Sequence, residues 1–107
     1  MLYKFKSKAA GDLVMLEPNG RRVLEIIGKQ PGATGIIQPG EMSAAVAALE
    51  RAIVDEEARL KQEAEDARAS GQKPARAEGV SLRQRAVPFI EMLRRCETAG
   101  HEIVWGV

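Results

Sequence analysis

The segments Leu2-Tyr3-Lys4-Phe5-Lys6 and Glu102-Ile103-Val104-Trp105 stand at the two ends of a chain of 107 residues whose middle has the composition of helices. Both segments are short and rich in aromatic or β-branched residues, a pattern typical of β-strands. An isolated strand leaves backbone donors and acceptors without partners, so each terminal strand needs another strand beside it. We therefore expect the two segments to pair in antiparallel fashion and to close a single domain over residues 1–107.

The composition is typical of a soluble globular protein, with 45% apolar and 29% charged residues. No apolar run approaches the ~20 residues that span a bilayer, and no continuous apolar stretch follows the first lysines as it would in a signal peptide. Cys96 is the only cysteine and cannot form an internal disulfide, which agrees with a reducing compartment. We expect a cytoplasmic protein without a membrane span.

The spacing of apolar residues favours a short helix over about 19–28 and a last helix over about 82–100. Between them, residues 41–69 are nearly all good helix formers. The apolar stripe of this long helix fades after Ile53, so its first half should pack and its second half should project. Residues at about 70–80 combine glycine, proline and scattered charge, which predicts a mobile loop between the two later helices.

The sequence does not predict a single structure for two segments. The run Leu13-Val14-Met15-Leu16, after a predicted connector over 7–12, fits a strand, a helical turn or a buried loop equally well. Pro88 cannot donate a backbone hydrogen bond, so the last helix either kinks there or restarts at Val87.

These elements define an α+β fold in which the two terminal strands pack on one short helix and a long helical hairpin. A two-stranded sheet is marginal on its own. It needs either helices on one face and solvent on the other, or a second copy of the chain that adds an edge strand.

Charge is unevenly distributed although the formal net charge is only +1. Residues 41–67 carry a net charge of −5, whereas residues 68–95 carry +5. If the two helices fold back on each other, each supplies the counter-charge of the other and the basic stretch needs no external anion.

Several blocks of sequence are distinctive in combination. They are Met1-Leu2-Tyr3-Lys4-Phe5, Leu24-Glu25-Ile26-Ile27-Gly28, Gly35-Ile36-Ile37 before Ala44 to Leu49, Val80-Ser81-Leu82-Arg83-Gln84-Arg85-Ala86-Val87-Pro88-Phe89-Ile90, and Val104-Trp105. In this order, and from end to end, the chain resembles a family of small bacterial proteins catalogued as a domain of unknown function, number eighteen-forty. The resemblance implies a bacterial, cytoplasmic, single-domain protein, and it implies no activity, cofactor or catalytic residue.

Candidate chemistry is sparse. Cys96 and His101 could form a thiolate and imidazole pair, but Cys96 lies on the apolar stripe of the last helix, where a free cysteine is usually a small core residue. One cysteine and one histidine are too few for zinc. The acidic clusters at 55–57 and 63–66 diverge around a helix and are interpreted as a solvated face. We predict no catalytic residue, cofactor or metal.

The arginines within the basic stretch 68–95 are the only surface that suggests nucleic acid. No aromatic side chains alternate with them, so base stacking is not expected and nucleic-acid binding is the weakest alternative. Near Pro88, Arg85 is the side chain expected to bind free carbonyls or a carboxylate, with Asp12 as one candidate partner.

The leading hypothesis is a homo-oligomeric binding or scaffolding module that uses the sheet edge or the projecting hairpin. The candidate interface residues are Leu2, Phe5, Ile103 and Trp105. The alternative is a small-molecule-binding protein or an enzyme with a pocket near the Gly32 to Gly40 loop, where Arg85 or His101 supplies polarity. The longer segment from Gly28 to Gly40 has enough glycine to suggest phosphate binding but matches neither nucleotide-binding fingerprint.

Overall fold

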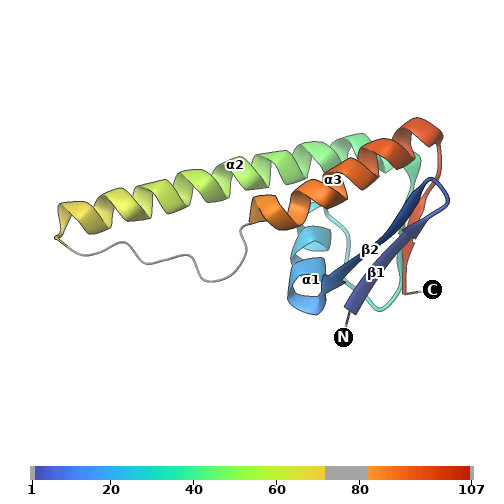
Figure 1. Ribbon diagram of the computed structural model, residues 1–107, viewed down its shortest axis with the longest axis horizontal. Helices are drawn as coiled ribbons and strands as arrows, with labels where there is room; N and C mark the ends of the chain where they lie inside the picture. The colour runs from blue at the N-terminus through green and yellow to red at the C-terminus, as the bar shows by residue number, and fades with distance from the viewer. Residues whose placement is uncertain (1, 72–81, 107) are drawn as a thin grey trace.

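The computed structural model describes residues 2–71 and 82–106, which form four strands and three helices (Figure 1). The elements are β1 (Leu2–Ser7), β2 (Ala10–Leu16), α1 (Glu17–Ile26), β3 (Gly35–Ile37), α2 (Pro39–Ala69), α3 (Leu82–Ala99) and β4 (Ile103–Trp105). The predicted α+β class is confirmed. The predicted loop at about 70–80 lies almost entirely outside the described residues.

The sheet is antiparallel throughout and has the strand order β2-β1-β4-β3. The two terminal strands are the central pair, with Phe5 opposite Trp105 and Lys6 opposite Val104. Their predicted pairing is confirmed. The expectation of a sheet with only two strands is wrong, because β2 and β3 extend it on either side. A sheet with an apolar face needs three or more strands to be stable independently, and this sheet has four.

The run Leu13 to Leu16 is the second half of β2. Residues 10–12 belong to the same strand, so the connector predicted over 7–12 is reduced to a tight turn around Lys8 and Ala9. All four residues of the run are apolar although only one face of the strand is buried. For that reason no alternation of apolar and polar residues marks it as a strand in the sequence.

The core lies between the sheet and the helices. Tyr3, Phe5, Ile103 and Trp105 point from the central strands toward the helices and are buried. The Phe5 ring stacks on Phe89 of α3, with ring centroids 4.7 Å apart. From the helices, buried residues come from all three and include Val23, Leu24, Met42, Leu49, Ile53, Leu82, Leu93 and Cys96.

Helix α2 changes character along its length, as predicted. Its buried residues end at Ile53, and the half beyond this point extends away from the sheet in Figure 1 (yellow). Helix α3 runs without interruption from Leu82 to Ala99 with Pro88 inside it. The alternative in which a new helix begins at Val87 is therefore wrong.

Candidate functional site

Cys96 and His101 do not form an exposed catalytic pair. Cys96 is fully buried in the core, as its place on the apolar stripe predicted. The backbone N–H of His101 donates to the Cys96 carbonyl at 3.0 Å, just after Gly100 takes up a positive φ of 73°. The two residues therefore end helix α3 and lead the chain into β4. Among the described residues, no group of three or more His, Cys, Asp and Glu side chains is placed to hold a metal ion.

Two core side chains donate hydrogen bonds to the connector between α1 and β3, residues 27–34. The Tyr3 hydroxyl donates to the Pro31 carbonyl at 3.0 Å, and Trp105 Nε1 donates to the Gly32 carbonyl at 3.1 Å. A Cβ atom at Gly35 would overlap the Trp105 ring. The glycine at this position thus allows close packing of β3 on Trp105.

A cavity of about 270 Å³ lies beside this connector, between the end of α1 and the start of α2. Its polar lining is the ion pair between Lys29 Nζ and Glu41 Oε1, at 2.8 Å. Glu41 Oε2 also accepts the backbone N–H of Gln38 at 2.8 Å, which caps α2. The hydrogen bond from Lys29, and then the one from Gln38, holds the pKa of the Glu41 carboxyl below its usual value. The Glu41 carboxylate therefore acts as the anion that binds both Lys29 and the start of α2.

The basic stretch pairs with the acidic helix, as predicted. Arg94 contacts Glu50 at 2.8 Å and Arg83 contacts Glu57 at 2.6 Å, so both ion pairs link α3 to α2. These arginines have protein partners of opposite charge. Asp12 forms an ion pair with Lys4 at 3.5 Å, and its suggested contact with Arg85 stays a prediction.

The face of the sheet opposite the helices carries exposed apolar side chains. Alternation along β1 places Leu2 and Lys4 on this face, because Tyr3 and Phe5 point into the core. The strand register then places further residues on the same face. On β2, Val14 lies opposite Lys4 and Leu16 lies opposite Leu2. On β4, Val104 lies between Lys6 of β1 and Ile36 of β3. We call the group Leu2, Lys4, Lys6, Val14, Leu16, Ile36 and Val104 the open sheet face.

Most of the exposed large apolar residues gather there. Five such side chains are exposed among the described residues, and four of them, Leu2, Val14, Leu16 and Ile36, belong to the open sheet face at 40–59% exposure. The fifth, Val54, lies on α2. Leu2 and Leu16 are directly opposite each other and form one apolar corner with Val14.

A groove of about 230 Å³ lies between the edge strand β2 and helix α3. We call it the β2–α3 groove. Leu13, Pro88 and Met92 provide its apolar lining, and Ala10 and Gly11 line it from the strand. Its charged lining is Asp12, Glu91 and Arg95.

The family model described as a domain of unknown function, DUF1840, matches residues 1–105. The chain belongs to this family. The resemblance seen in the sequence blocks is thereby confirmed. No curated protein and no solved structure matches the chain, so the geometry described above is what bears on the function of this DUF1840 member.

The structure separates the residues that the sequence singled out. Leu2 lies on the open sheet face, whereas Phe5, Ile103 and Trp105 lie in the core between sheet and helices.

No described helix is sufficiently long and apolar to cross a membrane.

The sequence did not lead us to predict Val14, Leu16 or the β2–α3 groove as candidate sites. The sequence did contain one indication that the outer face of β2 is unusually apolar. An antiparallel strand with one solvated face normally alternates apolar and polar residues. The run from Leu13 to Leu16 does not alternate.

Proposed function

We propose that the protein is a binding or scaffolding module that self-associates through the open sheet face. The observation that carries this proposal is the concentration of exposed apolar side chains on that one face. Contiguous exposed apolar patches on a folded domain commonly mark protein interaction sites. A second copy of the chain is the occupant for which the face is chemically suited.

The charges on this face support self-association. Lys4 is paired with Asp12 on the neighbouring strand, so the surface carries both signs of charge near its apolar corner. A second copy therefore presents a carboxylate as well as ammonium groups, and like charges need not be buried against each other. The isologous contact of a two-fold dimer requires this kind of self-complementarity.

The expected self-association is weak. Complete burial of a Leu, Ile or Val side chain contributes roughly 1.5–3 kcal/mol, so burying the exposed part of four side chains on each of two copies contributes roughly 6–12 kcal/mol. Association itself costs an estimated 4–15 kcal/mol or more. The native mass should therefore depend on protein concentration.

Sedimentation velocity tests the proposal over about 1 μM to about 1 mM, the range that corresponds to about −8 to −4 kcal/mol of binding free energy. The native mass should rise with concentration, and Leu16→Lys should abolish the rise by placing a charge in the apolar corner. Val54→Lys is the matched control, because Val54 is similarly exposed but lies on α2. A single-chain mass over the whole range would contradict the proposal.

A bacterial, cytoplasmic setting is part of the same proposal. Its cytoplasmic part is supported by the lone, buried Cys96, which is compatible with a reducing compartment. Recovery of the protein in the membrane fraction of lysed cells would contradict it.

A further inference from the structure

The strand β2 has one side without a strand partner. It is the terminal strand of the sheet and pairs only with β1. In the described part of the chain, no backbone hydrogen bond outside the helices and strands involves residues 10–16. Its outward N–H and C=O groups are therefore available to another extended segment.

The two edges of the sheet differ in how well they are protected against such pairing. The opposite edge, β3, has only three residues and is closely followed by Pro39. β2 has seven residues and contains neither lysine nor proline, the residues that commonly block edge pairing. Its protection is confined to Gly11, Asp12 and the irregular register opposite Phe5 to Ser7. β2 is the edge that can accept a strand.

The β2–α3 groove lies directly beside this edge and supplies places for side chains. Its apolar lining of Leu13, Pro88 and Met92 suits one apolar side chain. Of the three charged side chains that line the same groove, Asp12 is paired with Lys4, whereas Glu91 and Arg95 are exposed and take part in none of the described ion pairs. Arg95 is the stronger anchor for a peptide side chain, because a guanidinium binds a carboxylate through two parallel hydrogen bonds. At about 230 Å³ the groove is smaller than the ~300–1,000 Å³ of typical small-molecule pockets. Its size and position thus suit the side chains of a peptide whose backbone lies on the strand edge.

We propose that β2 binds an extended peptide segment of a partner protein by strand addition. The backbone of the peptide pairs with the edge of β2, and an apolar side chain enters the β2–α3 groove. An acidic side chain two residues away pairs with Arg95. The two-residue spacing follows from strand geometry, because residues i and i+2 of an extended peptide point to the same face. Main-chain hydrogen bonds would give affinity, and the two side chains would give specificity.

The strand β2 contains an acidic and an apolar residue two positions apart, Asp12 and Val14, but both point to the side of the open sheet face, where Asp12 is paired with Lys4. Leu13, which points to the side of α3, is adjacent to Asp12 and therefore on the opposite face from it. A second copy pairing through β2 would not present both side chains to the groove. The partner that we infer is a separate peptide, and this inference does not depend on self-association through the open sheet face.

The probe for the experiment is an array of synthetic heptapeptides of otherwise varied sequence. Each has leucine at the central position and glutamate two residues further on. Matched peptides carry lysine instead of glutamate, or an N-methylated backbone beside the leucine. The labelled chain of 107 residues should bind a subset of the glutamate peptides. Its affinity for their lysine counterparts should be lower by at least about tenfold. N-methylation should abolish binding, because it removes a donor from the strand pairing.

Charge reversal in the protein provides the decisive comparison. Arg95→Glu should weaken binding of the glutamate peptides and strengthen binding of the lysine peptides. Arg51→Glu is the control, because Arg51 is an exposed cation of α2 that does not line the groove. Circular dichroism should show that both variants keep the fold.

Three results would overturn the inference: no preference for glutamate over lysine, no reversal of that preference in Arg95→Glu, or undiminished binding of N-methylated peptides. Competition between the peptides and self-association of the chain would also overturn it, because it would assign the edge to a second copy. Leu2→Lys separates the two proposals, because Leu2 lies on the open sheet face but belongs to β1 and not to β2. This variant should weaken self-association and leave peptide binding intact.

Discussion

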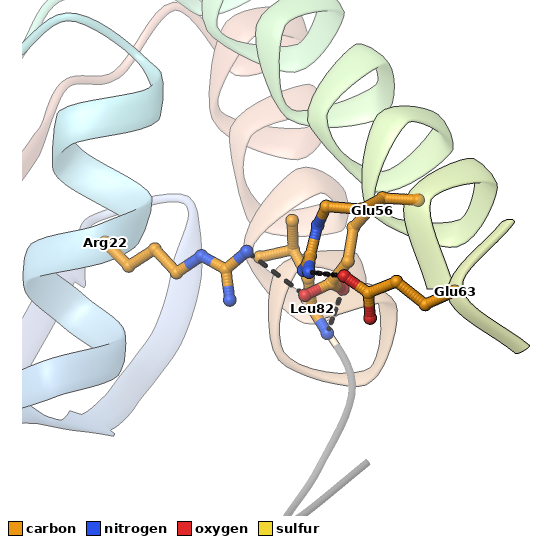
Figure 2. Close-up of polar contacts among 5 residues, drawn as sticks. Arg22, Glu56, Glu63 and Leu82 are labelled. Atoms are coloured by element: carbon orange, nitrogen blue, oxygen red, sulfur yellow. Dashed lines mark hydrogen bonds and ion pairs between the residues drawn. The ribbon is translucent and has the colours of Figure 1, made fainter. Parts of the chain in front are cut away.

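Glu56 of α2 accepts the backbone N–H of Leu82, the first residue of α3, at 3.0 Å. The other oxygen of this carboxylate binds Arg22 of α1 at 3.1 Å, so one largely buried side chain connects all three helices (Figure 2). The first N–H groups of a helix lack partners within the helix, and a carboxylate there also interacts favourably with the helix dipole. Glu56 thus caps α3 from a neighbouring helix.

The first prediction concerns this cap. Glu56→Ala should lower the free energy of unfolding by about 1–2 kcal/mol, because it removes a helix cap and an ion pair with a poorly exposed carboxylate. Glu63→Ala is the control, since Glu63 forms only an exposed pair with Arg59 and should cost less than about 0.5 kcal/mol. Urea denaturation of both variants measures the difference. Equal losses would show that Glu56 contributes no more than a surface charge.

The second prediction concerns the packing of β3 on the last strand. Gly35→Ala should lower the free energy of unfolding by about 1–3 kcal/mol, because the new methyl group would overlap the Trp105 ring and force it to move. Gly40→Ala has open space around the added methyl group and lies within α2. It should be neutral or stabilising by up to about 1 kcal/mol.

Thermal denaturation followed by circular dichroism compares the two variants with the original chain, and Trp105 fluorescence reports on the local change. A Gly35→Ala variant as stable as the original, with unaltered Trp105 emission, would contradict the predicted contact.

Some features of the fold could be predicted from the sequence and others could not. The pairing of the terminal strands was predictable because aromatic and β-branched residues cluster at both ends. The boundary at Ile53 was predictable because an apolar stripe over many turns is a strong periodic signal. The strand Gly35–Ile37 has only three residues, too few for any period to show.

The candidate binding surfaces were harder to predict for a related reason. Strand order is a tertiary property, so the sequence does not state that β2 is an edge or that α3 lies beside it. Glu56 likewise looked like one member of a solvated acidic run. Only the approach of Arg22 and Leu82, distant in sequence, distinguishes it from its neighbours.

The third prediction is a dependence of stability on pH through Glu41. Lys29 and the Gln38 N–H lower the pKa of this carboxyl in the folded protein. A group whose pKa is lower in the folded than in the unfolded state stabilises the fold above its unfolded pKa, and this contribution is lost as the pH falls through the folded pKa. Part of the acid loss of stability should therefore disappear in Glu41→Gln.

Urea denaturation at a series of pH values from neutral to acid measures this effect. The difference in stability between the original chain and Glu41→Gln should be largest near neutral pH and shrink below the ordinary value of 4.5 for this carboxyl. Glu65→Gln is the control, because Glu65 has no described hydrogen bond or ion pair. A difference that stays constant with pH would contradict the assigned role of Glu41.

The last prediction separates the two faces of the central strand. Phe5 is fully buried and stacks on Phe89, whereas Leu2 on the same strand is 58% exposed on the open sheet face. Phe5→Leu should lower the free energy of unfolding by about 1–3 kcal/mol through lost aromatic contact and a partly filled cavity. Leu2→Lys, measured at low protein concentration, should change it by less than about 0.5 kcal/mol, yet it should weaken self-association at high concentration. If Leu2→Lys instead destabilised the dilute chain as much as Phe5→Leu, the outer face of β1 would be part of the monomer core, and its apolar residues would no longer argue for a second copy.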